Sequence, residues 1–298
     1  MRIVVSGATG LMGSALVPSL RSAGHTVLRL TRSRQDAGAD EIWWDPANGV
    51  LDPAALEGVD AVVHLSGESI ATGRWTQDKK ARILNSRVNS TRLLGDALIA
   101  LTRPPQAWIC ASATGFYGSR GDEVLGEDSA AGTGFLSEVC QAWEAATAPA
   151  ADKGIRVINL RFGVVLSRAG GALQQMLTPF KLGLGGVFGN GAQFMSWIAV
   201  DDVPGVVQHL LATESLRGPV NAVAPSPVTN RAFTEALGKV LSRPTLFRMP
   251  AFAARLAMGE MADALLLASA RAVPKRLTDS GYAFAYPELE GALRHLLT

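Results

Sequence analysis

Short apolar runs alternate along the chain with longer stretches in which apolar residues recur every three or four positions. The short runs predict buried strands, and the longer stretches predict amphipathic helices. Strands are expected at residues 3–5, 26–31, 42–45, 60–66, 107–112, 156–166 and 219–223, and helices at 11–23, 76–101, 135–148 and 200–213. Apolar strands that alternate with helices are typical of a parallel sheet covered on both faces.

The pattern changes after Leu166. Glycine and aromatic residues crowd the segment up to residue 197, which we expect to form loops and short strands, and residues 230–298 are expected to be mostly helical. The predicted fold class is therefore α/β: a Rossmann-type, doubly wound parallel sheet with a small, mostly helical C-terminal lobe. The Rossmann domain is expected to span 1–166, with 198–224 returning to it, and the lobe to comprise 167–197 and 225–298.

Composition and charge narrow the function classes. The chain has 298 residues, of which 48% are hydrophobic, and its net charge of +2 does not favour a nucleic-acid partner. The most apolar long stretch, residues 251–273, is interrupted by four charged side chains, so we expect no membrane span and no membrane partner. Cys110 and Cys140 match no metal spacing and are expected to be reduced and buried. With no signal peptide visible, these features predict a cytoplasmic protein without a metal.

A glycine pattern, Gly7-x-x-Gly10-x-x-Gly13, directly follows the first predicted strand and begins a predicted helix. In that context such a pattern places a pyrophosphate on the backbone N–H groups of a helix N-terminus. The first glycine permits the tight turn, the second lets the backbone approach the phosphates, and the third allows close helix–strand packing. A purely structural turn is the alternative. The residues expected to bind a dinucleotide here are Gly7, Thr9, Gly10, Leu11, Met12 and Gly13.

The end of the second predicted strand indicates which dinucleotide is bound. The strand ends in Thr31-Arg32-Ser33-Arg34, and no carboxylate appears before Asp36. An acidic residue at this place accepts hydrogen bonds from the ribose hydroxyls of NAD, whereas a guanidinium binds the 2′-phosphate of NADP. We therefore expect NADP(H), with Arg32 as the main contact and Thr31, Ser33 or Arg34 assisting. The alternative is a solvated basic turn.

Further motifs follow this beginning. They are Trp44-Asp45-Pro46, His64–Ile70, Arg74-Trp75-Thr76, Ser86-Arg87-Val88, Trp143-Glu144, Arg161–Leu166, Gly183–Gly186, Trp197-Ile198 and Gly259-Glu260-Met261. Together they resemble the extended short-chain dehydrogenase/reductases and, more narrowly, the atypical "epimerase family" of NADP-binding proteins, also described as cell-division-inhibitor-like. The resemblance implies that the pyrophosphate and ribose are lined by His64, Leu65, Ser66 and Gly67. It also implies that Arg87 contacts the cofactor, with an ordinary surface arginine as the alternative.

The usual catalytic pair of that superfamily is absent from the sequence. Its working members use a tyrosine to move a proton and a lysine four residues later to lower the tyrosine pKa. No Tyr-x-x-x-Lys occurs here, and alignment on Trp143-Glu144 puts Leu136 and Cys140 at those positions. The remaining catalytic candidates follow the strand at 107–112 and are Ser112, Thr114 and Tyr117. A structural tyrosine packed under the lobe is the alternative for the last.

Four nearby acidic residues between Asp122 and Asp128 fit no metal-binding loop and are expected to form a solvated turn. Taken together, the sequence predicts an NADP(H)-binding protein that exchanges a hydride with an unidentified small-molecule substrate, as an oxidoreductase or an epimerase-like enzyme. The missing tyrosine–lysine pair keeps a second hypothesis open, a non-catalytic protein that responds to NADP(H). A homodimer is also left open.

Overall fold

A single large sheet organises the molecule. The computed structural model describes residues 1–34 and 38–298, and within them eight strands form this sheet in the order β13-β8-β6-β5-β1-β2-β3-β4. The strands are β1 (Arg2–Ser6), β2 (Thr26–Thr31), β3 (Glu41–Asp45), β4 (Val50–Leu51), β5 (Ala61–His64), β6 (Ala107–Ala113), β8 (Arg156–Phe162) and β13 (Gly218–Ala222). Neighbouring strands are parallel except β4, which is antiparallel to β3.

The chain reverses its direction across this sheet between β1 and β5. From β1 it runs outward through β2 and β3, and from β5 it runs the opposite way through β6, β8 and β13. In doubly wound sheets, ligands bind in the crevice outside the carboxyl ends of the strands at such a reversal. The predicted doubly wound sheet is confirmed, and its crevice lies where the glycine turn follows β1.

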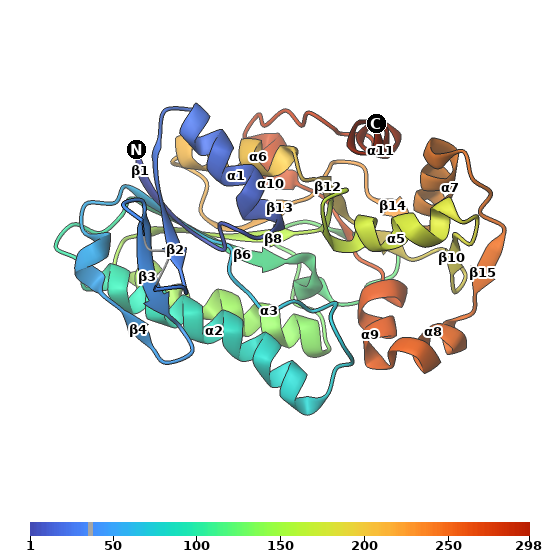
Figure 1. The fold of residues 1–298 in the computed structure, drawn as a ribbon, viewed down its shortest axis with the longest axis horizontal. Helices are drawn as coiled ribbons and strands as arrows, with labels where there is room; N and C mark the ends of the chain where they lie inside the picture. The colour runs from blue at the N-terminus through green and yellow to red at the C-terminus, as the bar shows by residue number, and fades with distance from the viewer. Residues whose placement is uncertain (35–37) are drawn as a thin grey trace.

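Helices cover both faces of the sheet (Figure 1). On one face, α1 (Leu11–Ser22) packs against α6 (Asp202–Ala212), and α10 (Lys275–Asp279) packs on β13. On the other face, α2 (Gln77–Ile99) packs against α3 (Phe135–Ala145) and α4 (Ala148–Asp152). The central strands are therefore apolar on both sides, and Ile3, Val4, Val62 and Val63 are fully buried.

A second hydrophobic core lies beside the first. It joins α5 (Gly171–Lys181), α7 (Asn230–Leu241) and α11 (Leu289–Leu297), and Phe233, Leu237 and Leu293 are buried within it. The short strand β9 (Val164–Leu166) leads into this core and pairs with β12 (Trp197–Ala199). Leu277 of α10, by contrast, belongs to the core of the main sheet, although it lies within the segment expected to form the lobe.

The remaining elements are short. Pairs of strands join β7 (Val124–Leu125) with β16 (Arg271–Ala272), β10 (Gly186–Phe188) with β15 (Phe247–Met249), and β11 (Phe194–Met195) with β14 (Val228–Thr229). The helical pieces are η1 (Pro53–Leu56), η2 (Thr114–Tyr117), α8 (Ala251–Met258), α9 (Glu260–Ala262) and the π turn η3 (Asp263–Leu267). No helix in the described ranges has the length and apolar content that a membrane crossing requires.

Three expectations about the elements were wrong. The segment after Leu166 contains the regular helix α5, because its glycines stand at or beyond the ends of the helix and not inside it. The strand expected at 156–166 breaks at Gly163, where an added Cβ would lie 2.5 Å from the Ser196 carbonyl oxygen. The helix expected at 135–148 ends at Ala145, since Pro149 lacks an N–H group and begins the short helix α4 instead.

Candidate cofactor and active site

The glycine turn forms the floor of the crevice at the carboxyl end of β1. Gly7 has a positive φ of 69°, and an added Cβ at Gly13 would lie 2.2 Å from the Gly7 carbonyl oxygen, so the turn closes tightly against the start of α1. Gly10 is the N-cap of α1 and supplies no side-chain cap, which leaves the first N–H groups of the helix to a ligand. Thr9 and Gly10 are exposed, and Leu11 and Met12 are half-buried.

The exit of β5 lies against this turn. An added Cβ at Gly7 would lie 2.9 Å from the Leu65 carbonyl carbon and 3.1 Å from the Ser66 nitrogen. The two strand ends that flank the chain reversal are thus in contact. A molecule lying across the N-terminus of α1 would meet the backbone of the β5 exit next, because the two loops share one edge of the sheet.

His64 sits below this edge rather than in the crevice. Its ring is fully buried, with Nδ1 2.6 Å from Ser6 Oγ and Nε2 3.1 Å from Ser90 Oγ. The Ser90 hydroxyl donates to the Ser86 carbonyl oxygen, so the histidine donates from Nε2 and accepts at Nδ1. Burial lowers the pKa of His64 to about 3, which keeps the ring neutral. The expected contact of His64 with the cofactor can therefore involve only its backbone.

The end of the crevice beside β2 is basic. Arg32 is exposed directly after β2, and the guanidinium of Arg34 lies 3.8 Å from the centre of the Trp43 ring. Thr31 Oγ1 accepts a hydrogen bond from the Ser33 amide, which shapes the turn. The pKa of Asp45 is lowered chiefly by a hydrogen bond from Asn48, with a smaller contribution from the charge of Arg32. Asp36 lies outside the described residues.

Arg87 of α2 reaches the loop that follows β5. Its Nη1 donates to the carbonyl oxygens of Glu68 and Ile83, each at 3.0 Å. An added Cβ at Gly67 would lie 3.2 Å from Arg87 Cζ, so a glycine is needed for this approach. The side chain is half-buried, and its Nε and Nη2 make no hydrogen bond within the described part of the chain. It is therefore not an ordinary surface arginine.

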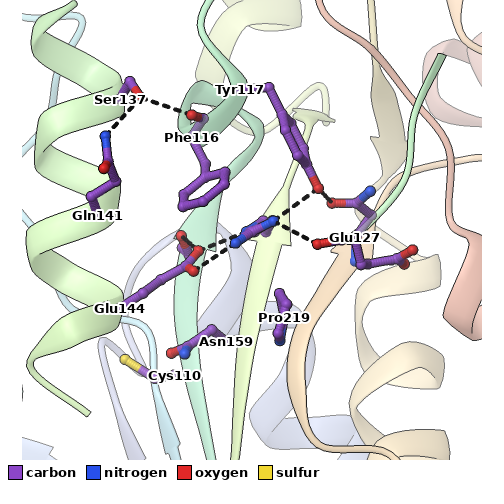
Figure 2. A network of polar contacts seen from close by, with 12 residues as sticks. Cys110, Phe116, Tyr117, Glu127, Ser137, Gln141, Glu144, Asn159 and Pro219 are labelled. Carbon is purple, nitrogen blue, oxygen red and sulfur yellow. Dashed lines mark hydrogen bonds and ion pairs between the residues drawn. The ribbon is translucent and has the colours of Figure 1, made fainter. Parts of the chain in front are cut away.

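A buried polar network spans the carboxyl ends of β6 and β8 (Figure 2). Arg161 of β8 forms a two-point ion pair with Glu144 of α3, at 2.7 Å from Nε to Oε1 and 2.8 Å from Nη2 to Oε2. The Ser112 hydroxyl donates to Glu144 Oε1 at 2.7 Å. Phe116 packs on the guanidinium, whose central carbon lies 3.5 Å from the ring centre.

Tyr117 closes the other end of the network. Its hydroxyl donates to Asn221 Oδ1 at 2.7 Å and accepts from Arg161 Nη1 at 3.0 Å, and the side chain is fully buried. Burial raises its pKa above the ordinary value of a tyrosine. The Tyr117 hydroxyl uses both its proton and a lone pair in hydrogen bonds inside the protein. Tyr117 therefore has the geometry of a structural residue.

Thr114 differs from the two other candidates. It begins η2, is half-buried, and its hydroxyl makes no hydrogen bond to any residue that the structure describes. An added Cβ on the neighbouring Gly115 would lie 3.3 Å from Leu136 Cβ and 3.8 Å from Cys140 Sγ. Both residues of α3 therefore face η2, and burial raises the pKa of Cys140 to about 11, so that position carries a neutral thiol.

A cavity of about 480 Å³ lies next to this region. Its lining combines the loop after η2, the glycine-rich segment before β11, the start of α8 and the segment after η3: Gly121, Asp122, Gly189, Asn190, Ala192, Gln193, Ala251, Arg255, Leu267 and Ser269. Arg74 and Trp75, which belong to one of the matching motifs, have protein partners. Arg74 donates to the carbonyl oxygens of Leu256 and Ala257, and Trp75 packs on Phe135.

Comparison with known proteins assigns the chain to a family. The family model described as "NAD dependent epimerase/dehydratase family" matches residues 3–222, which include the glycine turn, the β5 exit and the network around Arg161. The chain belongs to this family. A second model, described as a domain of unknown function (DUF1731), matches residues 249–296.

Two relatives of this epimerase-family protein are similar over their whole length. The epimerase family protein Mb2239 of Mycobacterium bovis is 44% identical over 99% of this chain and 97% of its own. Human epimerase family protein SDR39U1 (isoform 2), in a crystal structure with NADPH, is 35% identical with a TM-score of 0.90, covering 99% of both chains. The expectation of NADP(H) agrees with the cofactor in that human structure. UDP-N-acetylglucosamine 4-epimerase from Bacillus cereus, 19% identical with a TM-score of 0.75 over 99% of this chain and 98% of its own, shares the fold.

Sequence reasoning missed the centre of the network. Glu144 and Arg161 appeared only as parts of matching segments, yet they hold Ser112 and Tyr117 in place. An arginine inside the apolar run of β8 was the available signal, because a buried guanidinium needs a carboxylate partner. The prediction of a solvated acidic turn was wrong for Glu127. Its side chain is buried and accepts hydrogen bonds from the Asn221 and Arg276 amides.

Proposed function

We propose that this chain binds NADP(H) along the crevice and transfers a hydride between the nicotinamide and a small carbonyl or alcohol substrate. The observation that carries the proposal is the uncapped N-terminus of α1, which meets the exit of β5 where the sheet order reverses. N–H groups without partners at a helix N-terminus attract an anion, and a pyrophosphate fits the tight glycine turn in front of them.

The choice of NADP(H) over NAD(H) rests on the adenosine end of the crevice. Arg32 is exposed after β2 without an ion pair to any described residue, so it is available for a 2′-phosphate. Asp45, the acidic group that interacts with Arg32, already accepts hydrogen bonds from the Ala47 and Asn48 amides and from the Asn48 side chain. The phosphate therefore meets a guanidinium that forms no ion pair with residues 1–34 or 38–298. Arg87 supplies unused donors near the ribose.

When bound, the nicotinamide supplies or accepts the hydride. Thr114 hydrogen-bonds the substrate oxygen: for reduction it donates its hydroxyl proton to that oxygen as the hydride arrives at carbon, and water returns a proton to the threonine. Thr114 is favoured over Ser112 and Tyr117 because their hydroxyl protons are held by Glu144 and Asn221. The substrate oxygen thus receives one proton, and the reduced carbon receives one hydride.

In this proposal the substrate occupies the cavity of about 480 Å³ beyond η2. Asp122, Asn190 and Arg255 contribute polar groups to its lining. A volume of this size accommodates a small polar metabolite, since ligand pockets in proteins have about 300–1,000 Å³.

The reaction is tested by loading the protein with NADPH and following the nicotinamide absorbance against a panel of aldehydes and ketones. Turnover is expected for at least one class of carbonyl compound, with kcat reduced about a hundredfold in Thr114→Val and largely restored in Thr114→Ser. Thr213→Val, which removes a threonine hydroxyl after α6, is the matched control and should retain full activity. Unchanged turnover in Thr114→Val would exclude Thr114 from the mechanism.

A second function, a non-catalytic protein that changes conformation with NADP(H), is favoured by one observation. Leu136 and Cys140 face η2 where the resemblance expects a tyrosine and a lysine, and burial keeps the Cys140 thiol neutral through its raised pKa. Tight NADPH binding with no turnover on the whole panel would favour this function over the enzyme. Absence of measurable dinucleotide binding would remove both.

A further inference from the structure

One end of the lobe carries an unusual concentration of exposed apolar side chains. We call it the lobe-end surface and define it as residues 181–184 and 243–256. Leu246 is 86% exposed, Leu256 80% and Phe252 71%, so these side chains project into solvent. The large exposed apolar residues of this surface are Leu182, Leu184, Leu246, Phe247, Met249, Phe252 and Leu256. Such a concentration of exposed apolar side chains in neighbouring segments marks an interaction site rather than ordinary surface variation.

The two segments form one continuous surface. Arg243 Nε donates to the Lys181 carbonyl oxygen at 2.9 Å, and an added Cβ at Gly183 would lie 3.9 Å from Pro244 Cγ. Beyond this contact β10 and β15 pair in parallel, and α8 follows β15 after one proline. Figure 1 shows β10, β15 and α8 together at one end of the molecule, away from α1 and the main sheet.

The charge of this surface has a single sign. Residues 181–191 and 242–259 contain no aspartate or glutamate, whereas Lys181, Arg243, Arg248 and Arg255 are basic. Only Arg255 has an acidic partner within the described ranges, Asp263 at 2.9 Å. The other three cations are exposed among the apolar side chains. The local charge is therefore strongly positive, although the whole chain carries only +2.

We propose that the lobe-end surface binds the anionic phospholipid surface of a membrane, with the side chains of Leu246, Phe252 and Leu256 entering the headgroup region. Apolar side chains interleaved with lysine and arginine are typical of segments that lie in a membrane interface. This proposal departs from the sequence-based expectation of no membrane partner, and it requires no spanning segment.

The charge pattern argues against a second copy of the chain as the occupant. In a two-fold dimer the same patch meets itself, which would bring Lys181, Arg243 and Arg248 of both copies together without counter-charges. Protein interfaces also keep charges at the rim and bury aromatic anchors in shaped pockets. A fluid bilayer needs no shaped pocket, and its acidic headgroups supply the counter-charge for all three cations.

The proposal is tested by co-sedimentation of the full chain with vesicles of phosphatidylcholine alone, or of phosphatidylcholine mixed with phosphatidylglycerol. Binding is expected only to the anionic vesicles. Arg248→Glu should weaken it at least tenfold, since each cation near an anionic surface contributes about fivefold to binding. Phe252→Asp should also weaken it at least tenfold. Val50→Asp, which places the same charge on the exposed strand β4, is the matched control and should bind like the unaltered chain.

Because the substituted side chains are exposed, the variants should retain the melting temperature of the unaltered chain, which a thermal melt checks. Equal binding to both kinds of vesicle, no binding to either, or full binding by Phe252→Asp would overturn the proposal. A concentration-dependent dimer in sedimentation equilibrium that Phe252→Asp disrupts would also overturn it, in favour of a second copy. None of these outcomes depends on NADP(H), so this test is independent of the proposed function.

Discussion

Arg161, through its ion pair with Glu144, determines whether the hydroxyl groups of its neighbours are available for chemistry. Its side chain is 4% exposed and that of Glu144 is 12% exposed, so the pair is withdrawn from water. A buried ion pair contributes little net stability, but removal of one partner leaves an uncompensated charge. The pair also occupies the Ser112 hydroxyl and fixes Tyr117, which is why neither hydroxyl faces the crevice.

Glu144→Gln should therefore lower the free energy of unfolding by about 3–5 kcal/mol, because the amide cannot neutralise the Arg161 guanidinium. Urea denaturation followed by circular dichroism measures this loss. The matched control is Glu290→Gln, which breaks the exposed pairs with Lys239 and Arg294 and should cost far less stability, since water screens exposed ion pairs. Equal losses in the two variants would contradict the importance assigned to the buried pair.

His64 makes the stability depend on pH. Its pKa is about 3 in the folded chain because of burial, against an ordinary value of 6.5, so below pH 6.5 the unfolded chain binds a proton that the folded chain does not. This residue should lower the free energy of unfolding by about 1.4 kcal/mol for each pH unit below 6.5, down to pH 3. Urea titrations across this range should show a flatter dependence in His64→Asn. An unchanged slope in His64→Asn would contradict this role of His64.

Arg32 should decide the preference for the phosphorylated coenzyme. Arg32→Ala is expected to weaken NADPH binding by roughly 10- to 100-fold, the worth of a charge-assisted pair of hydrogen bonds, and to leave NADH binding almost unchanged. Fluorescence titration with each coenzyme measures both affinities. An equal loss for NADPH and NADH would mean that the substitution damaged the crevice instead of removing a phosphate contact.

At the scale of elements, the close packing of the glycine turn against α1 requires that residue 13 has no side chain. Gly13→Ala would place a Cβ 2.2 Å from the Gly7 carbonyl oxygen and 2.6 Å from Ala8 Cα, so the turn must open. NADPH binding should be lost, and the melting temperature should fall. Gly291→Ala is the contrasting change, because Gly291 lies inside α11 with no atom within 4 Å of an added Cβ. It should stabilise the chain by about 0.5–1 kcal/mol. Both effects are read from denaturation curves and NADPH titrations.

The elements of the main sheet were predictable because their sequences carry local signals. The strand, glycine turn and helix from Arg2 to Ser22 follow from apolar runs and glycine spacing, and the helix predicted over 76–101 is α2, which Thr76 caps. The helix α5 was missed because its flanking glycines were counted as part of it. The break at Gly163 could not be predicted, since it depends on the approach of Ser196 from a distant part of the chain.

The candidate site divides in the same way. Residues of the glycine turn and Arg32 could be predicted as candidates because backbone geometry and charge at a strand end are local properties. The partners of Ser112 and Tyr117 were not, because Glu144, Arg161 and Asn221 come from separate elements that meet only in the folded chain. Glu127 was misinterpreted for the same reason: its neighbours in sequence are acidic and exposed, while its partners lie near residues 221 and 276.

At the scale of the whole molecule, the crevice lies near the junction of the two larger hydrophobic cores that the described residues form. The main core holds the sheet rigid, and α7 of the second core contacts β10 of the glycine-rich segment. Leu11 connects the two parts directly, since added Cβ atoms at Gly170 and Gly171 would each lie 3.2 Å from its methyl groups. A ligand bound along the turn is therefore expected to stabilise the whole chain.

The central claim is that the crevice binds NADP(H) through the uncapped N-terminus of α1 and through Arg32. Isothermal titration calorimetry of the unaltered chain with NADPH and with NADH tests it most directly. We predict that NADPH binds at least ten times more tightly than NADH, by about 1.4 kcal/mol or more. Equal affinity for the two coenzymes, or no binding of either, would contradict the account.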